Sequence, residues 1–460
     1  VMLAKEFDPM KRRLDIKNFI QPKLDGVRCY ITKDGAFSRN HKPFKNCKHI
    51  TTTLQSFFKD YPDRILDGEL YNHKFKNDFN IGIHGNRLSL NDIHSNEIII
   101  KNNDRELGNY IKVDPVIAGR GFHWQKSIDI KVLGDLVVKN IDQQLFVINK
   151  IFLEDYLMCV ATSEMGAKCP QSLLEAQTIV ARSWILAAKE KKHQNLKLDA
   201  CNDDCCQRYQ GISNVVLSSV QAAQNTRGKV LIHGDTICDA RYSKNCGGIS
   251  ERGNNVWDIN FQPYLDSIID SENTDTIDLS KEEHFKEWLL NKQNSFCGPE
   301  YINEAYLGQY LGNVDEKGEY YRWEISYTNS ELVKIIYDKS GKQFSKIIMI
   351  HPIERGASGR ILTMKIIGKD GNGNDTSLKI KSEYEIRRIL HKKFLYSSAF
   401  IIETNSKHNN EDDFTLKGAG WGHGAGLCQI GALGMSLAGK TTEEIVFHYY
   451  KNTKLKDIYE

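Results

Sequence analysis

The sequence predicts a mixed α+β protein of several domains, in which a helical core is flanked by β-rich regions. Three observations lead to this class. The chain has 460 residues, which is more than one hydrophobic core usually supports. Short apolar runs bounded by turn residues, which are typical of strands, occupy much of residues 1–150 and 318–370. Residues 150–192, in contrast, carry apolar side chains at helical spacing.

The β-rich regions come first along the chain. Residues 1–80 are predicted to form strands and turns around two compact motifs. In residues 83–150, turn signals such as Asn102-Asn103-Asp104 separate short β-like runs. These runs are Glu97–Lys101, Tyr110–Val113, Leu133–Val138 and Gln144–Ile148.

The helical core begins after residue 150. One helix is predicted over Leu153–Glu164, and a second opens with Pro170, a residue suited to the first helical position. The loop between the two helices should face a cleft. Residues 226–270 and 318–370 are predicted to return to strands, and residues 383–395 and 441–450 to helices, with a glycine-rich loop at 418–431. We therefore expect domains at 1–82, 83–150, 151–275 and 276–460.

Composition and charge are those of a folded globular protein. Apolar residues make up 40% and charged residues 26% of the chain. Lys+Arg total 62 against Asp+Glu 59, a net +3 that favours neither nucleic acid nor a membrane as a partner. No run of about 18 apolar residues predicts a membrane-spanning helix, and residues 1–19 lack the apolar region of a signal peptide. The eleven cysteines, an odd number, cannot all pair within the chain.

Two motifs near the N-terminus carry residue types that nucleotide transfer requires. Residues 21–28 are QPKLDGVR and residues 66–71 are LDGELY, with SRN at 38–40 between them. Together they resemble the adenylation domain of ATP-dependent DNA ligases, and so predict a partial nucleotidyltransferase-like β segment. The resemblance implies that Lys23 attacks ATP and carries AMP. It also implies that Arg28 and Arg39 hold ribose or phosphate, while Glu69 contacts ribose or helps to bind magnesium.

The resemblance to ligases stops after residue 80. The chain has no downstream E-G-x-x-x-R segment, and a nucleotidyltransferase without that segment is not expected to complete adenylation. We therefore expect residues 1–80 to be a truncated remnant or a fusion without ligase activity. ATP, magnesium and DNA would be partners only if this segment were functional.

Four motifs between residues 153 and 432 carry a second resemblance. The first comprises LEDYL at 153–157, SEM at 163–165, LEAQ at 174–177 and ARSW at 181–184. The others are CNDDCCQRY at 201–209, TRG at 226–228 through DARYS at 239–243, and GAGWGHGAG at 418–426. In this order they resemble the sporulation stage II protein D and amidase-enhancer family, over residues from about 83 to 460. That family contains lytic transglycosylases, which cleave the glycan of bacterial cell walls and leave 1,6-anhydro ends.

The resemblance places the catalytic acid on Glu164. A lytic transglycosylase needs one carboxyl, which protonates the glycosidic oxygen and then accepts the proton of the sugar's 6-hydroxyl, whereas ordinary glycosidases need two carboxyls. Glu164 lies at a predicted helix end beside Met165, and a partly apolar site favours a protonated acid. The alternative is a surface glutamate at a helix terminus. Glu154 and Glu175 are competing carboxylates. Glu154 opens a helix and meets its dipole, so we expect a structural role for it, and we expect Glu175 to be supporting.

A cysteine-rich loop is a candidate metal site. Cys201, Cys205 and Cys206 lie within six residues, and His193 precedes them. Thiol and imidazole ligands on one loop suit structural zinc, and the resemblance implies zinc because some family members bind it here. The family pattern has a His where this chain has Cys205. We favour His193, Cys201 and Cys206 as ligands, with Cys205 as the alternative; free buried thiols or, in an exported protein, a disulfide are the other interpretations.

Further residues of the matched motifs are candidates for binding glycan. They are Arg182, Gln207, Tyr209, Tyr242, Ser243, Gly248, His423 and Gln429. Tyr209 and Trp257 could stack on sugar rings, although buried aromatic side chains are the commoner case. The alternating glycines of residues 418–426 predict a tight backbone path around His423. His423 would bind glycan, hydrogen-bond the Glu164 loop or have a structural role.

These observations predict a peptidoglycan lytic transglycosylase that prefers peptide-free glycan and works in the cell envelope or outside the cytoplasm. The family also fits an alternative, a non-catalytic wall-binding protein that enhances an amidase partner. A ligase or nucleotidyltransferase is a third hypothesis and rests on residues 1–80 alone. No signal peptide is visible, so the sequence does not identify an export route.

Overall fold

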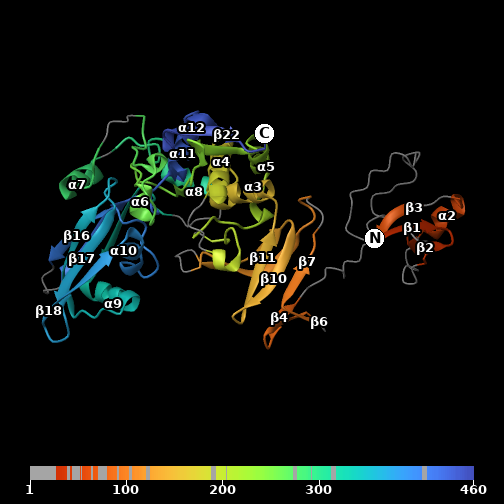
Figure 1. The fold of residues 1–460 in the computed structure, drawn as a ribbon, viewed down its shortest axis with the longest axis horizontal. Helices are drawn as coiled ribbons and strands as arrows, with labels where there is room; N and C mark the ends of the chain where they lie inside the picture. The colour runs from red at the N-terminus through yellow and green to blue at the C-terminus, as the bar shows by residue number, and fades with distance from the viewer. Residues whose placement is uncertain are drawn as a thin grey trace. The chain divides into compact units, whose positions relative to one another are not determined.

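The computed structural model describes most of the chain in two compact units. The described residues are 27–38, 42–43, 52, 54–63, 66–70, 80–90, 93–102, 106–120, 125–187, 193–203, 205–272, 277–291, 293–311, 318–406 and 412–459. One unit comprises the described parts of residues 1–101 and 136–148, and the other those of residues 102–135 and 149–460. Both units contain helices and strands (Figure 1), so the predicted α+β class is confirmed. In these ranges no helix has both the length and the apolar character needed to cross a membrane.

The first unit consists of small antiparallel sheets and one short helix, α2 (Gln55–Asp60). One sheet has the order β2-β1-β3 and is formed by β1 (Val27–Thr32), β2 (Gly35–Ser38) and β3 (Leu66–Leu70). A second is the meander β4 (Ile81–His84), β5 (Arg87–Leu90) and β6 (Ile93–Ser95). A third has the order β11-β10-β7 and is formed by β7 (Glu97–Ile100), β10 (Asp135–Ile141) and β11 (Gln144–Lys150).

The strands predicted between residues 97 and 150 are confirmed to within a few residues. The run at 110–113 is part of the hairpin β8 (Ile111–Ala118) and β9 (Lys126–Val132), which belongs mainly to the second unit. Asp142 and Gln143, both at positive φ, form the two-residue turn of the β10–β11 hairpin. Leu88, Ile98 and Val138 are buried together, so the apolar face of these strands is the core of the first unit.

Helices pack around the candidate site in the second unit. They are α3 (Leu153–Glu164), α4 (Gln171–Ala187), α5 (Leu217–Asn225), α11 (Gln429–Leu437) and α12 (Thr442–Tyr449). The first has the bounds predicted from sequence, and the second begins directly after Pro170. Leu173, Val180, Leu433 and Ile445 are almost completely buried in the shared core. Each such side chain stabilises the fold by about 1.5–3 kcal/mol relative to its exposed state.

Residues 226–270 contain fewer strands than predicted. Only β12 (Lys229–His233), β13 (Thr236–Ile237) and β14 (Tyr242–Ser243) are strands, and they are followed by the short helix α6 (Gly253–Val256) and loops. The prediction is therefore wrong for much of this stretch. Gly247 and Gly248 have φ values of 80° and 111°, which interrupt an extended path. The two-residue β14 pairs in parallel with β21 (Leu427–Cys428), and β12 also pairs with β22 (Lys454–Asp457).

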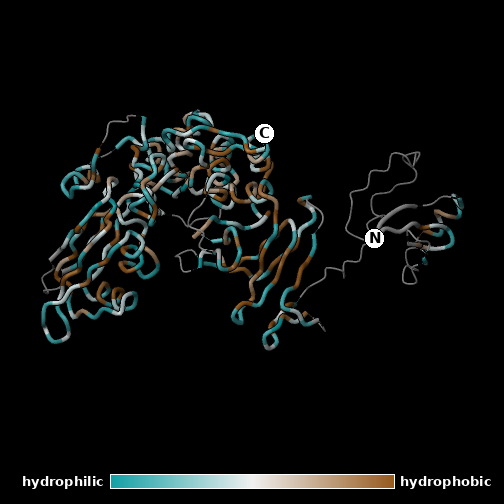
Figure 2. The backbone as a smooth tube through the Cα atoms, viewed as in Figure 1, coloured by the Kyte–Doolittle hydropathy of each residue, from teal (hydrophilic) through white to brown (hydrophobic). Residues whose placement is uncertain are grey.

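A β-rich region follows, as predicted for residues 318–370. Its sheets have the orders β15-β20-β19 and β16-β17-β18. The strands are β15 (Arg322–Tyr327), β16 (Lys346–Arg355), β17 (Ile361–Lys369), β18 (Asp375–Lys381), β19 (Phe400–Ser406) and β20 (Asp412–Ala419). Two helices, α9 (Asn329–Ser340) and α10 (Glu383–Ile389), contact the second sheet, and Ile335, Ile347 and Ile366 share its core. Figure 2 shows hydrophobic segments along these strands and hydrophilic residues at the hairpin tips.

Local capping explains the start and end of α9. Thr328 and Glu331 form a reciprocal capping box at its N-terminus, and Gly341 ends it in the left-handed conformation. This helix was not predicted from the sequence, and neither were α7 (Glu282–Leu290) and α8 (Glu304–Leu311). The helix predicted at 383–395 ends at residue 389, and that at 441–450 is confirmed. One hydrophobic core contains residues from Ala161 to Tyr450. The domain boundaries predicted at 82, 150 and 275 stay predictions.

Candidate functional site

Glu164 is the last residue of α3 and is 7% exposed. Acidic residues in the first turn of this helix meet the positive end of its dipole, and every residue from Leu157 to Glu164 is buried. The helix ends because Met165 adopts an extended conformation. The Glu164 side chain therefore leaves the helix inside the protein rather than on an open surface, which differs from the surface-glutamate alternative.

Three other segments of the chain supply donors to the Glu164 carboxyl group. The backbone N–H of Arg208 donates to Oε1 at 2.9 Å, and the Tyr242 hydroxyl donates to the same oxygen at 2.8 Å. The Gln429 amide donates to Oε2 at 3.4 Å. Lys244 Nζ donates to the Glu164 backbone carbonyl at 2.7 Å, which fixes the end of the helix. The cysteine-rich loop, β14 and the start of α11 thus converge on one carboxyl group.

Two tyrosines near the carboxyl group are held in the protonated form. Burial, and then the charge of Glu164, raise the pKa of Tyr242 well above its usual value, and the same two causes act on Tyr156. The Tyr242 hydroxyl is therefore a donor to Glu164 at any physiological pH. The Tyr156 hydroxyl donates to Gln207 Oε1 at 2.8 Å.

The structure brings together three of the predicted substrate residues, although their contacts are with the protein. Gln207, completely buried, also donates to the Ala181 carbonyl at 3.2 Å. Gln429 donates to Gln177 Oε1 at 3.2 Å as well as to Glu164. Gln429 and Tyr242 orient the acid directly, whereas Gln207 accepts from Tyr156. Their placement favours a positioning role over direct glycan contact.

Sequence reasoning missed four participants in this arrangement. Tyr156 and Lys244 lie within or beside motifs that had been noticed, but neither was singled out. Gln177 lies on α4 and looks like an ordinary helical residue. Arg208 contributes its backbone N–H, for which residue type carries no signal, so only the fold could have identified it.

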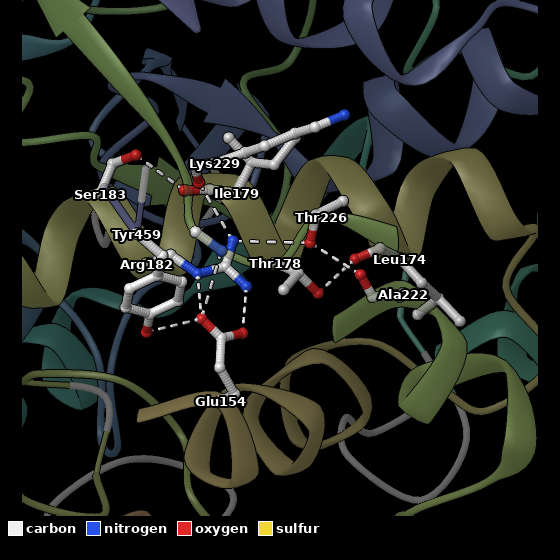
Figure 3. Close-up of polar contacts among 11 residues, drawn as sticks. Glu154, Leu174, Thr178, Ile179, Arg182, Ser183, Ala222, Thr226, Lys229 and Tyr459 are labelled. Carbon is white, nitrogen blue, oxygen red and sulfur yellow. Dashed lines mark hydrogen bonds and ion pairs between the residues drawn. The ribbon is translucent and has the colours of Figure 1, made fainter. Parts of the chain in front are cut away.

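Arg182 makes an internal ion pair instead of facing substrate. Its side chain is completely buried, and Nη2 lies 2.5 Å from Glu154 Oε2. Nε donates to Glu154 Oε1 at 3.0 Å, and Nη1 donates to the Lys229 carbonyl at 3.1 Å and to Thr226 Oγ1 at 3.5 Å. Figure 3 shows the guanidinium enclosed between these groups and the Tyr459 hydroxyl beyond Glu154. This geometry favours a structural role for Arg182 and for Glu154.

Other predicted glycan contacts are also buried. Tyr209 is 7% exposed, donates to Asn149 Oδ1 at 2.6 Å and stacks on Tyr156. Ser243 is buried in β14 next to Tyr242. Gly248 has no room for a side chain, because a Cβ would lie 2.9 Å from Trp288. Their burial disfavours the sugar contacts predicted from sequence and indicates that these residues shape the walls of the site.

The glycine-rich loop follows the tight path that its alternating glycines predict. Gly420, Gly422, Gly424 and Gly426 all have positive φ. A Cβ on Gly426 would lie 1.8 Å from the Arg241 carbonyl oxygen, so only glycine fits there. Because Gly426 lies so close to Arg241, β21 can pair with β14. This pairing brings Gln429 to the Glu164 carboxyl group.

His423 is packed within this loop. Its ring meets Trp257 edge to face at 4.7 Å, and its Nδ1 accepts the Ala425 N–H at 3.1 Å. Arg241 lies over the Trp257 ring at 4.5 Å. Burial is the main cause that lowers the pKa of His423 well below 6.5, and nearby arginines add to it. His423 is therefore neutral at pH 7, and its contacts favour the structural interpretation.

The neutral His423 is expected to make acidification destabilise the protein. Burial and the charges of Arg387, Arg360 and Arg241 lower its folded-state pKa, whereas the imidazole of the unfolded chain takes up a proton below pH ~6.5. The stabilisation is therefore fully present above pH ~6.5 and is lost as the pH falls, by at most about 1.4 kcal/mol per pH unit. Urea unfolding followed between pH 7.5 and 5 measures this loss.

A pair of variants isolates the contribution of His423. His423→Gln has no titrating group at this position, so its stability should fall less steeply with acidification than that of the wild type. His284→Gln, at an exposed position, should retain the wild-type slope. Equal slopes for wild type and His423→Gln would contradict the assignment.

The cysteine-rich loop gathers four metal-binding side chains, which we call the loop cluster: His193, Cys201, Cys205 and Cys206. Their ligand atoms all lie within 4.8 Å of one another, and all four side chains are partly exposed. Cys205 Sγ is 3.0 Å from Cys201 Sγ and 3.8 Å from His193 Nε2. Hydrogen bonds from Cys205 and Cys206 lower the pKa of Cys201 and favour a thiolate there. Three sulfurs and an imidazole are a donor set that fits tetrahedral zinc, and Cys205 lies with the three favoured ligands.

The N-terminal nucleotide motif is only partly described. Lys23 and Arg39 lie outside the described residues. Arg28 and Glu69 are described in their backbone alone, where they are opposite each other in the β1–β3 pairing. The resemblance of this segment to a ligase adenylation domain stays a prediction.

Comparisons with known proteins address the rest of the chain. Residues 141–233 match a family model described as stage II sporulation protein, and residues 251–426 match a domain of unknown function. An uncharacterized protein of Brachyspira hyodysenteriae is 24% identical over 71% of this chain and 73% of its own length. The stage II sporulation protein D of Bacillus subtilis is 23% identical over 67% of this chain and 76% of its own length.

A further relative is the amidase enhancer of Bacillus subtilis. It is 26% identical over 64% of this chain, which spans only 39% of that protein. The family-model match contains Glu164, Arg182 and the whole loop cluster, whereas Tyr242 and Gln429 lie beyond it. Taken together, these similarities support the relationship to the stage II sporulation protein D family that the sequence motifs predict.

Proposed function

We propose that this protein acts on bacterial cell-wall peptidoglycan outside the cytoplasm, as a lytic transglycosylase in which Glu164 is the acid and then the base. A cell-wall role is supported by the relatives named stage II sporulation protein D and amidase enhancer. The observation that carries the catalytic proposal is the convergence of three donors on the Glu164 carboxyl group. Such convergence onto one acidic side chain is typical of a working group.

The contacts of Glu164 stabilise the charged form that the second half of the reaction uses. In the first half the neutral carboxyl gives its proton to the glycosidic oxygen. In the second half the carboxylate takes the proton of the sugar's 6-hydroxyl as the 1,6-anhydro ring closes. The Arg208 N–H and the Tyr242 hydroxyl stabilise the carboxylate between the two steps.

We also propose that the loop cluster holds a structural zinc ion. The segment directly after Cys206 supplies the Arg208 N–H to Glu164, and the Gln210 N–H donates to Ser163 Oγ at 3.1 Å. When bound, zinc would cross-link this loop, and the loop would then hold both donors against the end of α3.

Removing the ion from the loop cluster is expected to lower activity without altering the acid itself. Loss of one hydrogen bond to a charged carboxylate costs about 1.5–3 kcal/mol, which corresponds to a rate loss of roughly tenfold or more. Cys201→Ser tests this through the rate of anhydro-end formation. Lys168→Ser, on the loop after α3, is a surface control that should keep the wild-type rate. A Cys201→Ser variant that is folded, has no zinc at the loop cluster and is fully active would contradict the role.

A second candidate function is favoured by one relative. The protein named amidase enhancer is 26% identical to the matched region, and the low exposure of Glu164 suits a binding protein as well as an enzyme. In this reading the chain binds cell-wall glycan and stimulates an amidase without cleaving sugar bonds.

Product analysis separates the two functions. Purified full-length protein is incubated with peptide-free glycan strands, and the products are analysed by mass spectrometry. The proposed enzyme forms 1,6-anhydro ends, which are one water lighter than hydrolysis products. An enhancer forms none but accelerates a purified cell-wall amidase on intact peptidoglycan. Reducing ends without anhydro ends would overturn the transglycosylase proposal and indicate a hydrolase.

A further inference from the structure

A second group of metal-ligating side chains lies deep inside the second unit, apart from the loop cluster. It consists of Cys246, Asp270, Cys297 and Cys428, which we call the interior cluster. Their ligand atoms all lie within 4.8 Å of one another. Their exposed fractions are 2%, 0%, 3% and 0%. The four residues come from four separate segments, so the fold rather than one local motif brings them together.

Two of the distances between these ligand atoms match those of a tetrahedral zinc site. Zinc bonds of about 2.3 Å to sulfur and about 2.0 Å to oxygen place neighbouring sulfurs about 3.8 Å apart, and a sulfur and an oxygen about 3.5 Å apart. The Sγ atoms of Cys246 and Cys297 are 3.8 Å apart. Cys246 Sγ lies 3.5 Å from Asp270 Oδ2. Both distances between ligand atoms are therefore those expected around a bound zinc ion.

Backbone N–H groups are directed at the sulfurs as acceptors. The Cys246 N–H donates to Cys428 Sγ at 3.1 Å, and the Gly431 N–H donates to the same sulfur at 3.3 Å. The Gly248 N–H donates to Cys246 Sγ at 3.4 Å. Cys428 is also the N-cap of α11, where the helix dipole favours negative charge. Donors of this kind stabilise thiolate sulfur, the form that binds metal.

The carboxylate of the cluster is also oriented by its neighbours. The Tyr449 hydroxyl donates to Asp270 Oδ1 at 2.6 Å, and the Cys297 N–H donates to Oδ2 at 3.1 Å. A Cβ on Gly431 would lie 2.5 Å from Oδ2, so glycine lets the start of α11 approach the carboxylate. Second-shell bonds that fix ligating carboxylates are typical of metal sites.

Positive groups nearby offset the negative charge that such a site would hold. A divalent ion with three thiolates and one carboxylate keeps two negative charges, which are costly to bury alone. Arg360, completely buried, donates from Nη2 to the Cys246 carbonyl at 3.2 Å. Arg322 donates from Nη1 to the adjoining Gly247 carbonyl at 2.9 Å.

We propose that the interior cluster binds one zinc ion at a closed structural site, with Cys246, Asp270, Cys297 and Cys428 as the four ligands. Thiolate-rich sets select zinc over the hard cations magnesium and calcium, and four protein ligands with no solvent-facing position mark a structural rather than a catalytic site. Binding forms three zinc–sulfur bonds and one zinc–oxygen bond, and each thiol releases its proton to solvent. No electron is transferred.

The metal content of the purified full-length protein tests this proposal. A Cys201→Ser, Cys206→Ser double variant removes ligands of the loop cluster only. After zinc supplementation and gel filtration, it should retain one zinc ion per chain by elemental analysis. That ion should resist a chelator in the native state and be released in denaturant, because the site is buried. Adding Cys297→Ser to this background should remove it.

The zinc content of these variants tests the proposal without any activity measurement. A folded double variant that holds no zinc after supplementation overturns it. So does a Cys246–Cys297 disulfide, seen as a mass two hydrogens lower, in protein purified and kept under non-oxidising conditions. If the Cys297→Ser variant does not fold, the zinc count and chelator resistance of the double variant still give the answer.

Discussion

Replacing Glu164 with glutamine is expected to reduce the rate of anhydro-end formation by about 10²- to 10⁴-fold, the usual contribution of a general acid or base. Glutamine keeps the size of the side chain and an oxygen that accepts from the Arg208 N–H and the Tyr242 hydroxyl. It cannot give a proton to the glycosidic oxygen or take one from the 6-hydroxyl. The rate is measured by mass spectrometry of products from peptide-free glycan strands.

Glu175→Gln is the matched control for this change. Glu175 lies on α4, and its carboxyl accepts hydrogen bonds from Gln171, Asn225 and Thr442. Its replacement should leave the rate close to that of the wild type, because its partners lie on α4, α5 and α12 and not at the Glu164 carboxyl group. If Glu164→Gln is as active as this control, Glu164 is not the acid, and if wild type itself makes no anhydro ends, the enhancer function is favoured.

Replacing Arg182 with methionine is expected to destabilise the second unit by about 3–5 kcal/mol, because it leaves a charged partner without compensation in the interior. Glu154 is only 12% exposed at its side chain and would lose its contact with Nε and Nη2. The Lys229 carbonyl would lose a donor as well. Urea unfolding monitored by tryptophan fluorescence measures the loss, and the buried Trp184 on the same helix makes it visible.

Arg252→Met provides the comparison for a surface ion pair. Arg252 pairs with Asp266 at 2.8 Å, but the two side chains are 47% and 42% exposed. Exposed pairs contribute about 0–1 kcal/mol, so the same substitution there should shift the unfolding midpoint little. The glycan-contact interpretation of Arg182 predicts instead a raised KM with unchanged stability, and that result would overturn the structural assignment.

The sequence predicts the helix pair at the site better than the loops around it. Leu153–Glu164 could be predicted to the residue because its apolar spacing and acidic first turn are local signals. Residues 226–270 could not, because their path is decided by contacts with distant residues. One example is the backbone exchange between Asn245 and Trp421. The helix α7 differs, because Phe285, Trp288 and Leu289 have helical spacing after an acidic first turn, so a local signal for this helix is present in the sequence.

The same distinction applies to the site. Glu164, Tyr242 and Gln429 belong to motifs and could be selected from the sequence, but their mutual hydrogen bonds could not. Arg182 is a candidate substrate contact because it belongs to a motif of the resembled family. Its partner Glu154 lies 28 residues earlier in the chain, and only the packing of α3 against α4 makes the pair internal.

The hydrogen bond between Gln429 and Glu164 joins residues that are 265 positions apart. The two-residue pairing of β14 with β21 joins Tyr242 to Leu427, which are 185 positions apart. Closing so long a loop costs conformational entropy before any contact compensates for it. On a ribosome that makes the chain from its N-terminus, α3 therefore exists well before the amide that completes its acidic end. The site cannot be completed until Gln429 has been synthesised, because a shorter nascent chain lacks this amide donor.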